Sequence, residues 1–258
     1  MKEVSIIIVN FNTPELVYDC IASIQEWLSV SNQIIVVDNG STIKLEPSRL
    51  PTECIYIDLP VNRGFGAGNN AGARQATGKY LWLLNSDTVL VDKSTVHLVR
   101  FLDGHPEVGI VSPYLFNNGH LQPDFYASFQ SFKTLLLRSA RPALETKAKY
   151  QPVDLVVGAA LMIRRPLFEQ LEGFDEHFFM YLEDDDLCLR AKQAGYSTVL
   201  LPSANIIHLQ GQSIDQSASR KNYYYRSQDY FWRKHYGRMA EIVMGLLRLP
   251  YRLLRNGR

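Results

Sequence analysis

The chain has 258 residues, of which 46% are hydrophobic and 21% are charged. This length and composition are ordinary for a soluble globular protein that buries one large α/β domain, alone or with an appendage. No apolar run approaches the roughly 20 residues that a helix needs to span a bilayer, so we expect no membrane-spanning helix.

The net charge of +1 is unevenly distributed along the chain. From Arg220 onward ten basic residues accompany two acidic ones, so the tail carries +8 and the first 219 residues carry −7. An acidic body with a basic tail indicates an anionic partner surface, either a membrane or a nucleic acid.

The three cysteines, Cys20, Cys54 and Cys188, are scattered and odd in number, and they lack the spacing of a zinc site. We interpret them as reduced thiols of the core in a cytosolic setting. The N-terminus leads directly into a predicted strand, without an apolar signal segment. These features predict a cytoplasmic protein.

Apolar runs predict the strands of the first half, and helical periodicity or glycine-rich turns predict what lies between them. We expect a strand over residues 4–9, a helix over 14–27, strands over 33–37 and 54–59, a turn over 62–72 leading into a helix that ends near residue 78, and a strand over 80–84. Polar residues follow three of the strands, as Asn10, Asp38 and the tripeptide Asn85-Ser86-Asp87. Open α/β sheets bind ligands at the carboxyl edge, so this order predicts a nucleotide site.

The tripeptide Asn85-Ser86-Asp87 allows two interpretations. A carboxylate at the carboxyl edge of a sheet commonly holds a divalent cation and, through it, phosphate oxygens. Alternatively, the tripeptide only turns the chain and caps the next helix.

The second half is predicted to extend the sheet and to add a basic helical tail. We expect a helix over 94–103, strands over 108–111 and 154–164, a short helix from 166, a helix over 187–194, a strand over 196–201 and helical structure from 223. Residues 114–151 are irregular, and we expect loops or short helices that shape a second-substrate site. Gly158 marks a bend, a close approach by a ligand or a simple bulge. His208 is expected in a polar loop.

Four consecutive carboxylates, Glu183-Asp184-Asp185-Asp186, precede the helix over 187–194. The helix dipole favours acid there by about 0.3–1 kcal/mol per residue, but each carboxylate repels its neighbours. Apolar residues flank the cluster on both sides, so it is partly desolvated. Crowding and desolvation push the pKa of a carboxyl group upward, toward general-base catalysis.

Six motifs occur in order: VSIIIVNFN, VVDNGS, NRGFGAGNNAG, LLNSDT, VGAALMIRR and GFDEHFFMYLEDDDLCLRAKQAGY, with a histidine after them. From about residue 3 to 210 the chain resembles bacterial family 2 glycosyltransferases of the rhamnosyltransferase-like branch. The resemblance implies a GT-A fold, a Rossmann-like nucleotide-binding sheet of mostly parallel strands with helices on both faces. It also implies inverting transfer from a nucleotide diphosphate sugar. Residues 1–215 would form this domain, and residues 216–258 a basic, helical C-terminal extension.

The resemblance also assigns donor-binding residues. Asp38 would bind the nucleobase, with Asn10 and Phe11 beside it at the end of the first strand. Arg63 would meet the nucleotide or its diphosphate.

The metal and the base follow from the same resemblance. Asp87 would ligate Mg²⁺ or Mn²⁺, and His208 falls where some relatives have a further metal ligand, although a lone histidine is often structural. Asn85 stands where relatives carry the first Asp of an Asp-x-Asp motif, so Asn85 and Ser86 would contact the donor instead. Asp184 would take the proton from an acceptor hydroxyl, typically worth a factor of 10²–10⁴, while the metal offsets the charge of the leaving diphosphate.

Two other functions fit parts of the sequence. Gly66 to Ala71 match G-x-G-x-x-A, a dinucleotide fingerprint of NAD-dependent oxidoreductases, but residues 60–64 separate the first glycine from its strand. Replacement of the first Asp by Asn85 suits a non-catalytic nucleotide-sugar binding protein with a degenerate metal site.

The sequence gives less specific evidence for the role of the tail and for the identity of the substrates. Residues 239–258 space apolar side chains among arginines, which suits an interfacial membrane helix better than a nucleic-acid groove, and equally suits a helix packed on the body. The expected donor is dTDP-rhamnose, with galactofuranose, glucose and N-acetylated sugars on UDP left open. The expected acceptor is a cell-surface polysaccharide on a lipid carrier.

Overall fold

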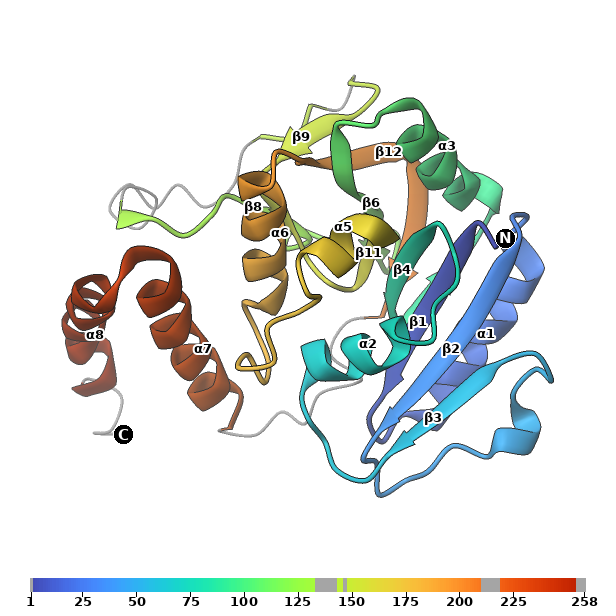
Figure 1. Ribbon diagram of the computed structural model, residues 1–258, viewed down its shortest axis with the longest axis horizontal. Helices are drawn as coiled ribbons and strands as arrows, with labels where there is room; N and C mark the ends of the chain where they lie inside the picture. Colours follow the sequence, from blue (N-terminus) through green and yellow to red (C-terminus); the bar gives the residue numbers. More distant parts are fainter. Residues whose placement is uncertain (1, 133–142, 146–147, 210–218, 254–258) are drawn as a thin grey trace.

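The computed structural model describes residues 2–132, 143–145, 148–209 and 219–253 (Figure 1). Its strands are β1 (Val4–Asn10), β2 (Asn32–Asn39), β3 (Ile55–Leu59), β4 (Tyr80–Asn85), β5 (Thr88–Leu90), β6 (Val108–Asn117), β7 (His120–Leu121), β8 (Tyr126–Ala127), β9 (Gln151–Val153), β10 (Leu155–Val156), β11 (Ala160–Arg164) and β12 (Ser197–His208). The helices are α1 (Pro14–Trp27), α2 (Phe65–Ala73), α3 (Val96–Gly104), α5 (Arg165–Gln170), α6 (Glu183–Gln193), α7 (Ser219–Tyr236) and α8 (Arg238–Leu253), with 3-10 turns at Pro47–Arg49 and Lys93–Thr95.

The main sheet has the strand order β3-β2-β1-β4-β11-β6-β12-β5. Strands β3, β2, β1 and β4 are parallel, β11 is antiparallel to both of its neighbours, and β12 is again parallel to β6. From β3 to β12 all strands except β11 therefore point the same way. Helices lie on both faces, with α1 and α2 on opposite sides of β1 (Figure 1). The predicted α/β architecture of mostly parallel strands is confirmed.

The central strands are buried on both faces, as their apolar runs predict. In β1, Ile6, Ile7 and Ile8 are all fully buried, and each contributes about 1.5–3 kcal/mol by leaving water. The register pairs Asn10 with Asp38 and brings Asn85 opposite Val9. The polar residues that follow these strands therefore share one edge of the sheet.

Helix α2 begins at Phe65, inside the segment predicted to be a turn, and it ends before the expected residue 78. Its glycines allow a close approach to the sheet. A Cβ atom on Gly68 would lie 2.8 Å from Val9 Cγ1, and one on Gly72 would lie 2.5 Å from Ile7 Cγ2. Tertiary packing thus outweighs the low helix propensity of glycine here. These glycines pack inside a helix and do not form the strand-to-helix turn of a dinucleotide fingerprint.

Two strands are longer than predicted. Strand β6 continues to Asn117, and β12 continues to His208, which therefore ends a strand and does not lie in a loop. A register shift between Leu201 and Asn205 lets β12 bend and pair with both β6 and β5. Residues 133–142 and 146–147 of the predicted irregular segment lie outside the described residues.

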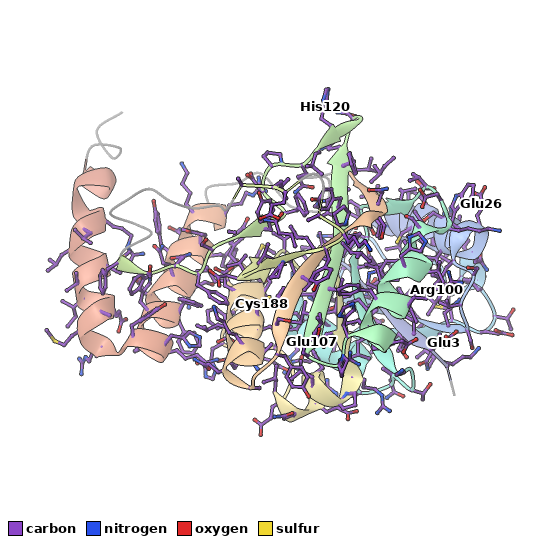
Figure 2. All side chains as sticks on the ribbon, turned by 90° about the horizontal axis from the view of Figure 1, so that it is seen from above. Glu3, Glu26, Arg100, Glu107, His120 and Cys188 are labelled. Carbon is purple, nitrogen blue, oxygen red and sulfur yellow. The ribbon has the colours of Figure 1, made fainter. Side chains whose placement is uncertain are left out.

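The three cysteines are free thiols, as expected. Cys188 lies in the middle of the molecule (Figure 2), where burial raises the pKa of its thiol to about 12. A thiol with so high a pKa is unreactive at neutral pH, so Cys188 serves packing.

The C-terminal helices α7 and α8 lie together at one end of the molecule, with α7 next to α6 (Figure 1). Buried contacts hold α7 on the body: Ser227 Oγ donates to the carbonyl oxygen of Met180 at 2.8 Å, and Phe231 and Trp232 are fully buried. The predicted helical tail is confirmed up to Leu253, and α7 packs on the body. Within the described part of the chain, no helix is long and apolar enough to cross a membrane.

Candidate active site

A cavity of about 330 Å³ opens at the carboxyl edge of β1 and β4, and we call it the first cavity. Its wall contains six of the nine predicted site residues: Phe11, Asn85, Ser86, Asp87, Asp184 and His208. The sheet contributes the residues after β4 and the end of β12, and the start of α6 contributes Asp184. Positions almost a hundred residues apart thus face one cavity.

Asp87 and His208 come together because β5 pairs with the end of β12. His208 Nε2 lies 3.3 Å from Asp87 Oδ1, and both side chains are buried. On the other side of the ring, Nδ1 lies 2.9 Å from Gln122 Oε1. Because this oxygen only accepts, Nδ1 is the donor to Gln122, and Nε2 is the ring nitrogen that faces the carboxylate.

This arrangement fits a divalent cation. A cation between Nε2 and the carboxylate would bind to both groups, and Gln122 would orient the ring through its hydrogen bond to Nδ1. In residues 2–132, 143–145, 148–209 and 219–253, no group of three His, Cys, Asp or Glu side chains could hold a metal ion. Asp87 and His208 would therefore need further oxygen ligands, such as substrate phosphates.

Asp184 stands at the first turn of α6 and borders the cavity. Its carboxylate accepts hydrogen bonds from the backbone N–H groups of Gly158 and Asp185, both at 3.0 Å. Burial raises the pKa of Asp184, and those two bonds oppose the rise. A half-buried carboxylate with a raised pKa, held in place by backbone donors, is suited to accept a proton.

Gly158 lies between β10 and β11, where the strand was expected to be interrupted. A Cβ atom there would lie 2.9 Å from Phe65 Cε1, so any larger residue would have to displace the Phe65 ring for the backbone to reach Asp184 as it does. The interruption thus brings the backbone close to a carboxylate of the site.

Tyr181 and Leu182, which precede α6, both have left-handed backbone conformations, with φ of 71° and 67°. Such conformations cost of order 1–3 kcal/mol each for residues other than glycine, and they concentrate at functional sites. Here they turn the chain into α6 and bring the Tyr181 side chain to the cavity wall.

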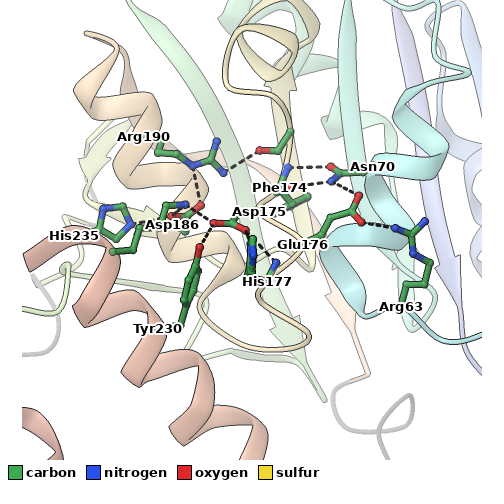
Figure 3. Close-up of polar contacts among 12 residues, drawn as sticks. Arg63, Asn70, Phe174, Asp175, Glu176, His177, Asp186, Arg190, Tyr230 and His235 are labelled. Atoms are coloured by element: carbon green, nitrogen blue, oxygen red, sulfur yellow. Dashed lines mark hydrogen bonds and ion pairs between the residues drawn. The ribbon is translucent and has the colours of Figure 1, made fainter. Parts of the chain in front are cut away.

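The four acidic residues of α6 differ in environment. Burial, together with the charge of Asp184, raises the pKa values of Glu183 and Asp185 well above the ordinary range. Burial also opposes ionisation of Asp186, but His235, Arg190 and Lys234 outweigh it and lower its pKa. Figure 3 shows these partners: Asp186 is bound by Arg190 at 2.7 Å and by His235 at 2.8 Å. Asp186 is therefore a structural anion that joins α6 to α7.

Three predicted site residues lie outside the wall of the first cavity. Asn10 and Asp38 are buried, and Asn10 Nδ2 donates to Asp38 Oδ2 at 3.0 Å. The backbone N–H of Ser41 donates to Asp38 Oδ1 at 2.9 Å. Burial disfavours the charge of Asp38, but these bonds and Lys44 lower its pKa. Arg63 is paired with Glu176 at 2.7 Å (Figure 3). The roles predicted for Asn10, Asp38 and Arg63 stay predictions.

The cavity wall also contains residues that were not predicted from the sequence as site residues, among them Asn39, Tyr181 and Arg220. Asn39 connects β2 to the turn before α2, because its Nδ2 donates to the carbonyl oxygen of Gly64 at 3.0 Å. Arg220, from α7, lies with its Nε 3.3 Å from the hydroxyl of Tyr181. Arg220 was visible in the sequence only as part of the basic tail.

Comparisons with known proteins agree with the resemblance. Residues 5–172 match the family model described as glycosyl transferase family 2, and residues 140–211 match one described as the N-terminal domain of galactosyltransferase. A low-salt glycan biosynthesis hexosyltransferase, Agl10 of Haloferax volcanii, is 28% identical over 86% of this chain and 72% of its own length. The Escherichia coli rhamnosyltransferase WbbL is 26% identical over 56% of the chain and 60% of its length.

A shorter match is to the N-acetylglucosaminyl-diphospho-decaprenol L-rhamnosyltransferase of Mycobacterium tuberculosis, 44% identical over 24% of this chain and 20% of that protein. Among solved structures, GalNAc-T7 with UDP, GalNAc and Mn²⁺ has a TM-score of 0.66 at 14% identity, over 90% of this chain and 50% of that one. The mannosyltransferase PcManGT from Pyrobaculum calidifontis, with GDP-Man and Mn²⁺, has a TM-score of 0.61 at 18% identity, over 89% of this chain and 62% of that one. These structures identify the fold as GT-A. The chain spans about half to two thirds of their length.

Proposed function

Because the chain belongs to glycosyl transferase family 2, we propose that it transfers a sugar from a nucleotide diphosphate donor to a hydroxyl group of a glycan, with inversion at the anomeric carbon. The observation that carries this proposal is the common cavity of Asp87 and Asp184. A carboxylate and an imidazole on one wall suit a divalent cation, which in turn would bind the diphosphate end of a donor. On another wall, a carboxylate with a raised pKa is suited to accept the proton of an attacking hydroxyl.

In this mechanism Asp184 accepts the proton of the acceptor hydroxyl while that oxygen attacks the anomeric carbon. Gly158 and the amide of Asp185 fix the carboxylate by their hydrogen bonds. A base so placed typically contributes a factor of 10²–10⁴. Asp87 and His208 are the residues that would hold Mg²⁺ or Mn²⁺, and such a cation supplies charge neutralisation for the leaving diphosphate.

The remaining residues would position the donor. Phe11 is 38% exposed at the cavity and offers a flat ring to the nucleoside. Asn85 and Ser86 would contact ribose or sugar. Asn10 at the end of β1 and Asp38 near the end of β2 would fix the nucleobase end, and Arg63 would meet the diphosphate after leaving Glu176.

We propose dTDP-rhamnose as the first donor to test, because two of the relatives are named rhamnosyltransferases. The name of the mycobacterial relative includes a diphospho-decaprenol acceptor, which supports a lipid-linked acceptor here. Residues 1–215 would be the transferase domain and residues 216–258 its extension.

We further propose that the enzyme is cytoplasmic and binds the membrane surface through α8. Along this helix Met239, Leu246 and Leu247 are 72%, 59% and 56% exposed, and α8 is the outermost element at its end of the molecule, opposite Glu3 and Glu26 (Figure 2). An exposed apolar helix face beside basic residues suits an anionic lipid surface. Leu246→Glu should abolish co-sedimentation with phosphatidylglycerol vesicles. Ile43→Glu, at a residue 58% exposed elsewhere, is the matched control.

A non-catalytic nucleotide-sugar binding protein is the second candidate, favoured by Asn85 and by the absence of a three-ligand metal cluster among the described residues. A screen of sugar nucleotides separates the two candidates. We expect one donor to raise the melting temperature, more strongly with Mn²⁺ than without, and to release its nucleotide diphosphate when an acceptor is added. Stabilisation without any nucleotide release would favour the binding protein. Stabilisation by NAD alone would contradict both.

A further inference from the structure

A second cavity, of about 440 Å³, adjoins the first. Asp124, Val157, Tyr181, Glu183 and Asp184 line both cavities. The proposed base therefore stands on the boundary between the two, with a separate space on each side of it. This arrangement suits a reaction that joins two substrates at one carboxylate.

The rest of the second wall combines aromatic rings with amides. Tyr126 comes from β8, and Tyr224 and Gln228 come from α7. Aromatic faces provide flat apolar surface for the C–H groups of a sugar ring, while phenol and amide groups bond to its hydroxyls. The wall thus suits a neutral or weakly charged sugar better than a second phosphate, because Glu183, Asp184 and Asp185 line it as well.

The environment of Glu183 indicates that a ligand binds at this wall. It is 6% exposed, and its Oε2 atom is buried without a hydrogen-bond partner in the described part of the chain. Buried polar atoms nearly always have a partner, so an unpaired carboxyl oxygen at the wall of two cavities indicates a group that binds there. A sugar hydroxyl provides the matching donor.

Helix α7 is held firmly in its place at this wall. Gln228 Nε2 donates to Gln130 Oε1 at 2.8 Å, and farther along α7 Lys234 Nζ lies 2.6 Å from the buried carboxylate of Asp186. The contacts of Asp186 and Asp175 with α7 that Figure 3 draws therefore hold this helix, which carries Tyr224, against α6, which carries Asp184. The C-terminal extension is part of the wall and not only an appendage.

We propose that the second cavity binds the sugar ring of the acceptor and that α7 completes it, with Tyr224 stacking on the ring and Gln228 bonding to a hydroxyl. The inference rests on the proposed function. The attacking hydroxyl passes between Tyr181 and Glu183 to Asp184. Its proton moves to the Asp184 carboxylate, its oxygen bonds to the anomeric carbon, and the bond from that carbon to the diphosphate oxygen breaks.

The test compares Tyr224→Ala, Tyr224→Phe and Tyr150→Ala in the full chain. Tyr150 is the matched control, because it is 39% exposed against 38% for Tyr224 and packs on Phe101 instead. The probes are the methyl glycosides of glucose, galactose, rhamnose and N-acetylglucosamine. Each is titrated with the donor found in the screen, and nucleotide diphosphate release is measured.

We expect at least one glycoside to accelerate release above the rate with water. Tyr224→Ala should then raise the KM for that glycoside by about tenfold and leave the KM for the donor within about twofold, while Tyr224→Phe and Tyr150→Ala stay near wild type. The inference is overturned if Tyr224→Ala leaves the KM for the glycoside unchanged or if Tyr150→Ala raises that KM equally. It is also overturned if no glycoside accelerates nucleotide diphosphate release. If the wild type turns over no sugar nucleotide, the proposed function fails instead.

Discussion

Neighbouring aspartates of α6 should respond to the same substitution in opposite ways. Asp186 is fully buried and accepts from Arg190 at 2.7 Å and from His235 at 2.8 Å, while Lys234 Nζ lies 2.6 Å away. Asp186→Asn removes the anion beside Arg190 and His235, whereas Lys234 keeps its ion pair with Asp175 at 2.7 Å. Breaking a buried ion pair costs about 3–5 kcal/mol. That is a large share of the roughly 5–15 kcal/mol by which a domain is stable.

In the part of the chain that the structure describes, no ion pair holds Asp185, and burial with the charge of Asp184 raises its pKa. Asp185→Asn removes an unfavourable charge, so we expect the free energy of unfolding to change by less than about 1 kcal/mol, or to rise. The assay is thermal unfolding followed by circular dichroism at pH 7. For Asp186→Asn we expect a fall in melting temperature of roughly 6–20 °C.

The pH dependence gives a second readout. The folded-state pKa of Asp186 lies below its unfolded value, so its contribution is present above about pH 4 and is lost as the pH falls through the folded value. The difference between wild type and Asp186→Asn should therefore shrink in acid. Equal melting temperatures for Asp185→Asn and Asp186→Asn at pH 7 would refute this interpretation of the cluster.

Three further predictions concern the first cavity. Gly158→Ala should lower transfer about tenfold or more, because the new Cβ meets Phe65 and displaces a donor to Asp184; a near-normal rate would contradict this. Burial raises the pKa of Asp184, so kcat/KM should fall as the pH drops through that raised pKa, which lies above the ordinary value of about 4. Loss of the hydrogen bond from Gly158 should move the midpoint of this pH profile upward, and a downward move would count against Asp184 as the base. His208→Ala should weaken Mn²⁺ binding in the presence of nucleotide about 10–100-fold by calorimetry, whereas an unchanged affinity would remove His208 from the metal site.

Much of the sheet edge could be predicted from the sequence. The apolar runs of β1, β2 and β4 specify strands buried on both faces, and the polar residues after such strands necessarily meet at one edge. Asn85, Ser86 and Asp87 reach the cavity for this local reason. The acidic start of α6 was likewise visible as a run of carboxylates.

The other features depend on contacts that no local pattern encodes. His208 ends a strand because a bend in β12 lets it pair with β5. The left-handed conformations of Tyr181 and Leu182 oppose local preference and are imposed by the surrounding structure. Arg220 reaches the cavity because buried ion pairs between α6 and α7 bring the basic tail back to the body.

The assignment of Asp184 as the base has the most direct test. Transfer of the sugar and affinity for the nucleotide diphosphate with Mn²⁺ are measured for wild type, Asp184→Asn and Asp87→Asn. We predict that Asp184→Asn loses a factor of about 10²–10⁴ in transfer and keeps its nucleotide affinity within roughly threefold, whereas Asp87→Asn loses both. Turnover near wild type in Asp184→Asn would contradict the account.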